Sequence, residues 1–129
     1  MSIALATWTP TGNVFEMFKV MKTYMAPPPT PAPRSPFEWG NADRVRELLS
    51  SAFQLQFEPA TSFYREPSAE AAWQTFVTGY GPTRMLAASL DADKREMLHK
   101  DFVAFHDKFR TDLGTCVPRD YLITVGKRV

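Results

Sequence analysis

Hydrophobic and polar residues recur along this chain with two different periods, and these periods predict its secondary structure. The short apolar run Ile3–Trp8 predicts a buried strand, which the turn-forming residues Thr9–Gly12 end. Apolar residues then follow at helical spacing from Val14 to about Met25, with Asn13 as the predicted N-cap. Because this helix is apolar on more than one face, we expect the rest of the fold, a partner or an apolar ligand to cover it.

The next part of the chain is a proline-rich connector over residues 26–40. Its six prolines lie within Pro27–Pro36 and remove so many amide donors that we expect neither a helix nor a central strand over that segment. The PxxP spacing also occurs in ligands of SH3 domains, but a plain loop is the favoured interpretation. Asn41 then caps a predicted amphipathic helix that runs through Ser51.

The rest of the chain predicts two strands separated mostly by helix. Residues 53–57 alternate between apolar and polar and predict a strand that Pro59 ends or bends, and residues 62–65 continue it. A helix opens at Pro67–Ser68, breaks at residues 79–82, and precedes a short segment over residues 83–89. Asp91 caps the longest helix, for which Gly114 is the predicted stop. Tyr121–Lys127 is a β-branched run that predicts a buried strand.

This order of elements predicts the fold class. Strands and helices alternate as strand, helix, helix, strand, helix, helix, strand, which favours an α/β (α+β) architecture. We expect one domain over residues 1–129, in which helices cover a small mixed sheet of about three strands.

Composition and charge narrow the possible functions. The chain is 44% hydrophobic and 22% charged, as in ordinary globular proteins, and its net charge of +1 provides no field that would attract nucleic acid. No apolar stretch approaches the roughly 20 residues of a membrane span. Cys116 is the single cysteine, so no intramolecular disulfide can form, and a reducing cytoplasm is the expected location.

Four sequence segments carry a resemblance to a known family. They are Ile3-Ala-Leu-Ala-Thr-Trp-Thr-Pro-Thr-Gly, Ser35-Pro-Phe-Glu-Trp-Gly, Phe63-Tyr-Arg and Asp120-Tyr-Leu-Ile-Thr-Val. Together with the order of elements they resemble the C-terminal half of a class I S-adenosylmethionine-dependent methyltransferase of the small-molecule type, similar to the ubiquinone and menaquinone C-methyltransferases. The resemblance implies a sheet ordered first, last, middle, in which the last strand is antiparallel to both neighbours.

The donor side of that family has no counterpart in this sequence. The only G-x-G, Gly79-Tyr80-Gly81, follows a predicted helix and is closed by Pro82, whereas a nucleotide-type loop lies between a strand and a helix. We therefore expect no cofactor-binding residue here, and S-adenosylmethionine is implied by the resemblance alone. The predicted function is the acceptor-binding half of a methyltransferase, inactive alone or one part of a split enzyme. The alternative is a non-catalytic module that binds an apolar small molecule or a protein partner.

The resemblance places the acceptor-binding residues after the first strand and on the following helix, at Trp8, Thr9, Phe15 and Phe18. Tyr64 and Arg65 extend this set, because ligands of open α/β folds often lie at a sheet end, and Trp73 extends it as one of several aromatic residues that could line a pocket. Arg65 could hold an acidic group of a substrate, or pair with Glu66 or another surface acid. For the aromatic residues, a place in the core is the competing interpretation.

His106 is the one weak candidate for a catalytic residue. It could act as a general base toward a phenolic or enolic acceptor, or be a polar residue at the edge of a helix interface. His99 lies seven residues before it, too far along a helix for the pair to chelate one metal, so no metal site is expected.

The N-terminal strand carries the prediction about partners. In the intact family fold another strand covers its outer edge, so here the edge is expected to be unpaired and apolar. We expect a homo-oligomer, most simply a two-fold dimer through this edge or through helix 14–25, or else a separately encoded N-terminal half.

Overall fold

The computed structural model describes all 129 residues, and the chain divides into two compact units. The strand unit consists of Met1–Phe15, Pro28–Ser62 and Pro118–Val129. The helical unit consists of Glu16–Pro27 and Phe63–Val117. Each unit is therefore assembled from segments that are far apart in the sequence.

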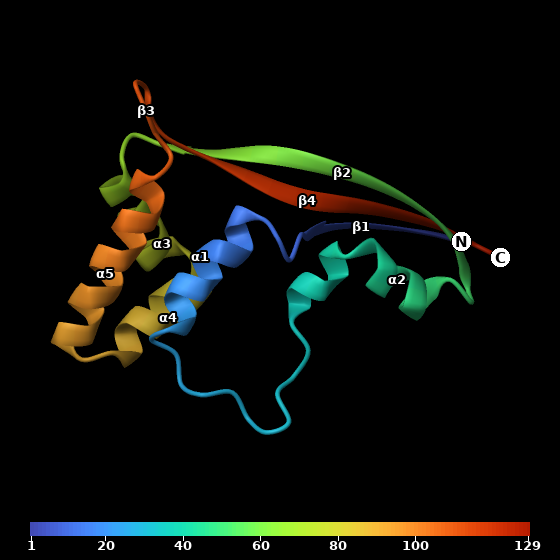
Figure 1. Cartoon of the computed structure of the whole chain (residues 1–129), viewed down its shortest axis with the longest axis horizontal. Helices are drawn as coiled ribbons and strands as arrows, with labels where there is room; N and C mark the ends of the chain where they lie inside the picture. Colours follow the sequence, from blue (N-terminus) through green and yellow to red (C-terminus); the bar gives the residue numbers. More distant parts are fainter. The chain divides into compact units, whose positions relative to one another are not determined.

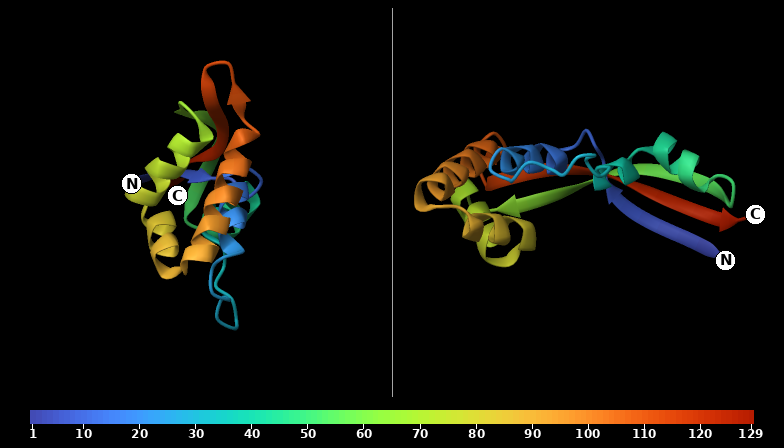
Figure 2. Two further views of the ribbon diagram at one scale, coloured as in Figure 1. Left: turned by 90° about the vertical axis from the view of Figure 1, so that its left-hand side faces the viewer. Right: turned by 90° about the horizontal axis from the view of Figure 1, so that it is seen from below.

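The sheet has four strands: β1 (Ser2–Trp8), β2 (Phe53–Glu66), β3 (Arg110–Thr111) and β4 (Gly114–Arg128). They are ordered β1-β4-β2, and the two-residue β3 pairs with β4 (Figure 1). Neighbouring strands are antiparallel, so β1 and β2 run in one direction and β4 runs between them in the other (Figure 2). The predicted fold class and the order first, last, middle are confirmed, but the sheet is antiparallel rather than mixed and has β3 as an additional short strand.

In the strand unit, β1 forms one edge of the sheet and is half covered along its length. Ile3, Leu5 and Thr7 are partly buried, whereas Ala4, Ala6 and Trp8 are exposed. The expectation of a buried strand was wrong, because only one face of β1 is covered. On β4 the same covered face carries the fully or nearly fully buried residues Leu122 and Thr124, which pair with Thr7 and Leu5.

The proline-rich connector ends in a 3-10 helix, η1 (Pro36–Gly40), which begins at the last residue of the segment Pro27–Pro36 where no helix was expected. Pro36 occupies the start of η1, where no amide donor is needed, and the Ser35 hydroxyl accepts a hydrogen bond from the Phe37 N–H. Helix α2 (Ala42–Leu49) follows, and Asn41 caps it as predicted by accepting the Asp43 N–H at 3.0 Å. Together η1 and α2 lie beside the strands of this unit (Figure 1).

The two short strands predicted around Pro59 are one strand, β2. Pro59 lies inside it, and the alternation of covered and exposed residues shifts by one position at Glu58–Pro59, where both residues are exposed. A local irregularity in strand pairing produces a shift of this kind. Pro59 is tolerated inside β2 because β2 lies at a sheet edge.

The helical unit is built from the second part of α1 (Asn13–Lys22) and from α3 (Ala69–Gly79), α4 (Gly81–Ser89) and α5 (Ala92–Asp107). Ser68 and Asp91 cap α3 and α5 with their side chains, the latter as predicted. The break between α3 and α4 falls at Tyr80, inside the predicted segment. The helices surround a core whose members include Met17, Met21, Ala72, Trp73, Phe76, Leu98, Phe102 and Phe105.

Two predicted helix ends were wrong. Helix α1 stops at Lys22, and Met25, the last residue of its predicted apolar stripe, is 50% exposed. Helix α5 stops at Asp107, and the chain turns back through β3 into β4. Gly114 belongs to this turn, where its φ of +113° favours glycine, and Leu113 beside it is 95% exposed.

Candidate functional site

The candidate site lies in the strand unit, where β1 ends and the chain turns toward α1. The Thr9 N–H donates to the Asp120 carbonyl at 3.2 Å, which extends the β1–β4 register by one pair. Gly12 approaches this pair so closely that a Cβ on it would lie 2.9 Å from Thr9 Oγ1 and 3.4 Å from Asp120 Cβ. The absence of a side chain at position 12 therefore lets the turn fold back onto the end of the strand.

Polar groups gather around this strand end. Asn13, the predicted N-cap, is the first residue of α1. Its side chain donates from Nδ2 to the Pro118 carbonyl of β4 at 2.8 Å. The Thr61 hydroxyl donates to Asp120 Oδ1 at 2.7 Å. Thr9 Oγ1 is buried and has no hydrogen-bond partner in the structure. A buried hydroxyl of this kind usually has a partner, so Thr9 is an unusual group at this strand end.

Aromatic rings form the apolar part of the site. Trp8 is 39% exposed, and its ring contacts Tyr121 edge to face with the centroids 6.2 Å apart. Phe15 contacts Phe37 in the same way at 5.2 Å. Trp8 and Thr9 are consecutive at the end of one strand, so their side chains point to opposite faces of the sheet. The arrangement can therefore hold a flat apolar molecule against Trp8 on one face, whereas Thr9 and Asp120 lie on the other face.

The predicted site residues fall into both units. Trp8, Thr9 and Phe15 belong to the strand unit, as described above. The other members of the predicted set belong to the helical unit, where Phe18 contacts Tyr80 edge to face at 6.3 Å. Only the first three residues are therefore assigned to one candidate site.

In the helical unit, Tyr64 and Arg65 have partners within their own strand. The Tyr64 hydroxyl donates to Glu66 Oε1 at 2.6 Å, and the Thr75 hydroxyl donates to the same oxygen at 2.8 Å. The Arg65 guanidinium lies 5.7 Å from the centre of the Phe63 ring. Arg65 is thus placed over an aromatic face, and Glu66 binds two hydroxyl groups instead.

His106 and Trp73 are buried in the helical core. His106 has no exposed surface, donates from Nδ1 to the Phe102 carbonyl at 2.9 Å, and stacks on the Phe102 ring. The expectation that His106 lies at the edge of a helix interface was wrong, because its ring lies inside the interface. Trp73 is 4% exposed and stacks on His99, whose Nε2 lies 2.7 Å from Glu70 Oε2. Both side chains pack as core residues do.

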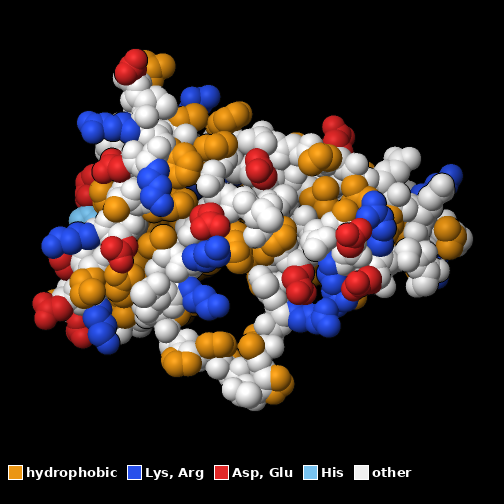
Figure 3. Space-filling view, viewed as in Figure 1, with side chains coloured by type: hydrophobic (Ala, Val, Ile, Leu, Met, Phe, Trp, Pro, Cys, Tyr) orange, Lys and Arg blue, Asp and Glu red, His pale blue; other side chains and the backbone are white.

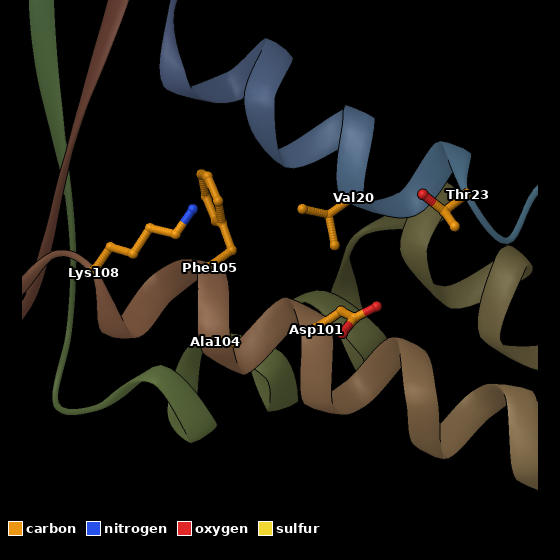
Figure 4. A pocket seen from close by; sticks show the side chains of 6 residues that line it. All are labelled: Val20, Thr23, Asp101, Ala104, Phe105 and Lys108. Carbon is orange, nitrogen blue, oxygen red and sulfur yellow. The ribbon is translucent and has the colours of Figure 1, made fainter.

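A hollow of about 290 Å³ lies between α1 and α5 in the helical unit. Val20 and Phe105 face each other across it, with Lys108 toward one end and Asp101 toward the other (Figure 4). The Asp101 carboxylate accepts a hydrogen bond from the Tyr24 hydroxyl, and this bond is the main reason that the pKa of Tyr24 is raised to about 12. The charged residues that line the hollow, Asp101 and Lys108, are exposed, so the hollow is a surface depression rather than a closed pocket.

The G-x-G of this chain does not have the surroundings of a nucleotide-type loop. Gly79 ends α3 and Gly81 begins α4, so the G-x-G lies between two helices and no strand leads into it. Basic and acidic side chains are interspersed on the face drawn in Figure 3. None of the helices combines the length and the apolar character that a membrane span requires.

Sequence reasoning found Trp8, Thr9 and Phe15 but missed the residues that β4 and β2 bring to them. Asp120, Tyr121 and Thr61 complete the strand end, and they lie about 50 to 110 residues further along the chain. The only signal that could have located them is the pairing register of the last strand, which sequence alone did not fix. Searches with family models and among curated proteins found no match to this chain.

Proposed function

We propose that this chain is the acceptor-binding half of an S-adenosylmethionine-dependent methyltransferase that acts on a small aromatic or enolic molecule. The observation that carries the proposal is the strand order β1-β4-β2, with β4 antiparallel between two strands that run the same way. This is the order that the resemblance implies for the last three strands of that family. The donor-binding half, wherever it is encoded, would have to supply the methyl group.

The end of β1 supports the choice of acceptor chemistry. Trp8 offers a partly exposed aromatic wall, and Thr9 offers a buried hydroxyl without a hydrogen-bond partner. The Asp120 carboxylate can accept a hydrogen bond from an acidic hydroxyl, as it does from Thr61. A flat aromatic ring that stacks on the indole fits the face of Trp8, and the hydroxyl and carboxylate groups of Thr9 and Asp120 belong to the opposite face.

The proposal is tested by calorimetric titration of the chain with a methoxyhydroquinone that lacks a prenyl tail. We expect saturable binding that weakens roughly 2- to 12-fold in Trp8→Phe, the range that one aromatic contact contributes. Trp39→Phe is the matched control, because Trp39 is 38% exposed and lies in the same unit. Equal loss in both variants, or no binding by the parent chain, would refute the acceptor site.

Two further arms separate the parts of the proposal. Thr9→Val removes the unpartnered hydroxyl, so it should leave the free energy of unfolding unchanged or raise it by about 1 kcal/mol, and it should leave binding of the hydroquinone at Trp8 unchanged because Thr9 lies on the opposite face. Titration with S-adenosylmethionine should give no saturable heat up to millimolar concentration. Saturable binding of the donor would show that the chain carries a donor site of its own.

A second candidate function is a non-catalytic module that binds an apolar small molecule or a protein. The half-exposed apolar residues on one sheet face favour it, among them Trp8 and the 43% exposed Val125. The dimethyl ether of the hydroquinone distinguishes the candidates, because it is more apolar but has lost both hydroxyl hydrogens. Tighter binding of the ether supports the apolar module, and tighter binding of the free hydroquinone supports the acceptor half.

A further inference from the structure

The outer edge of β1 carries backbone groups that no strand of the chain uses. β1 is the first strand in the order β1-β4-β2, so one of its sides faces away from the sheet. Two backbone hydrogen bonds at the ends of the pairing fix which residues turn toward β4. The Arg128 N–H donates to the Met1 carbonyl at 3.0 Å, and the Thr9 N–H donates to the Asp120 carbonyl at 3.2 Å.

These two bonds determine which residues along the whole of β1 form backbone hydrogen bonds with β4. In an antiparallel pair the residues that exchange hydrogen bonds alternate with residues that do not. Met1 and Thr9 exchange bonds with β4, so the other odd-numbered residues between them do so as well. The backbone N–H and C=O groups of Ser2, Ala4 and Ala6 therefore point outward, and those of Trp8 do too.

One of the four outward positions is already covered. A Cβ on Gly40 would lie 2.0 Å from the Trp8 carbonyl oxygen, so the end of η1 rests directly on that group. The Thr7 hydroxyl, on the neighbouring residue, donates to the Trp39 carbonyl at 2.7 Å and holds η1 in place. The free part of the edge is therefore the segment Ser2–Ala6.

This edge has none of the features that prevent strand pairing. Native proteins protect sheet edges with charged residues, prolines or bulges. The opposite edge of the sheet, β2, carries Glu58 and Pro59 within the strand unit, where the alternation also shifts. In contrast, β1 has the sequence SIALATW, which contains no charge and no proline.

We propose that the occupant of this edge is a second copy of β1, paired antiparallel about a two-fold axis at Ala4. With Ser2–Ala6 free, the register that pairs every outward residue sets Ala4 opposite its own copy and Ser2 opposite Ala6. Three residue pairs then exchange two hydrogen bonds each. The alternative register centred on Leu5 would need the Trp8 carbonyl, which Gly40 covers.

The side chains of β1 are complementary to themselves in this register. Ile3 of one copy lies opposite Leu5 of the other, twice, in the positions where side chains come closest. Ile3 and Leu5 are partly buried on the covered face, so the apolar contact continues across the two-fold axis. On the other face the small side chains of Ala4 and Ala6 leave room for close approach. No like charges meet anywhere along the paired segment.

The interface does not rest on the proposed function, and its test uses this chain alone without donor or acceptor. Sedimentation velocity from about 1 to 100 μM should show a reversible change from monomer to dimer. A chain that stays monomeric over the whole range overturns the proposal. Hydrogen exchange adds a measurement on the parent chain: the amides of Ala4 and Ala6 should exchange at least tenfold more slowly in the dimer than in the diluted monomer.

Charge variants test the register. Ala4→Lys places two ammonium groups opposite each other at the two-fold axis, and Ala4→Asp places two carboxylates there, so each variant alone should be monomeric. An equimolar mixture of the two should dimerise again. Ala4→Pro removes the outward N–H but none that β4 uses, and it should also be monomeric with an unchanged far-ultraviolet spectrum. Dimers that persist in all three variants would place the interface elsewhere.

Discussion

The close approach of Gly40 to the end of β1 makes the substitution Gly40→Ala a severe test of the structure. A Cβ at this position would lie 2.0 Å from the Trp8 carbonyl oxygen and 2.6 Å from Thr9 Cα. Both are backbone atoms, which cannot rotate away as a flexible side chain can. Overpacking typically costs about 1–3 kcal/mol, and a displacement of η1 would also strain the Thr7 hydrogen bond to Trp39. We therefore expect a loss of about 2–3 kcal/mol in the free energy of unfolding.

Urea unfolding followed by tryptophan fluorescence measures this loss, because Trp8 and Trp39 both lie in the strand unit. For a chain of this length, 1 kcal/mol corresponds to roughly 3–4 °C in the midpoint of thermal unfolding, so the midpoint should fall by about 7–11 °C. Gly79→Ala is the matched control. It has nothing within 4 Å of the new Cβ and should be neutral or stabilising by up to about 1 kcal/mol. A Gly40→Ala chain within about 0.5 kcal/mol of the parent would refute the close approach of η1 to β1.

Three further predictions concern the helical unit. Phe102→Ala removes a fully buried ring and should lower the free energy of unfolding by about 3–5 kcal/mol in urea titrations. The hydrogen bond to Asp101 raises the pKa of Tyr24 to about 12. The contribution of this bond to the free energy of unfolding is therefore present below pH 10 and is lost as pH rises through about 12. Absorbance titration should show one late-ionising tyrosine, which Tyr24→Phe removes. The hydrogen bond from His99 lowers the pKa of Glu70 below its ordinary value of 4.5, so its contribution to stability is present above that value and lost on further acidification. Urea unfolding of Glu70→Gln between about pH 6 and pH 3 should show a shallower loss of stability than the parent.

The elements that the sequence predicted best are those whose ends depend on local chemistry. Asn41 and Asp91 each accept a backbone N–H of the helix that follows, and both were recognisable as caps from their residue type and position. The break between α3 and α4 likewise follows from residues 79–82 alone. A cap needs only the next few residues to act, so it can be recognised without any knowledge of the rest of the fold.

The predictions that failed depend on contacts between distant parts of the chain. Leu113 has the spacing of a helical core residue, yet α5 ends at Asp107 because the chain pairs back on itself through β3 and β4. Pro59 has the appearance of a strand end, yet β2 continues through it as an edge strand. In both cases strand pairing overrides a local pattern, and the pairing register cannot be derived from one short segment.

The same limit applies to the candidate site. Trp8 and Thr9 could be named from the turn that follows an apolar run, but Asp120 joins them only through the register of β4. Their exposure could not be predicted either, because it depends on which face of β1 is covered. The resemblance gave the strand order in advance, since order is a property of the whole fold rather than of any single segment.

The alternating directions of backbone groups and side chains along β1 relate the candidate site to the proposed interface. Trp8 is an even-numbered residue, so its side chain lies on the exposed face while its carbonyl points to the outer edge, where Gly40 covers it. That contact divides the strand into a free segment, Ser2–Ala6, and a closed end that carries Trp8 and Thr9. Pairing with a second copy along the free segment therefore leaves the site end uncovered by the added strand. It follows that Ala4→Lys should abolish the dimer without weakening the binding of a phenolic molecule at Trp8.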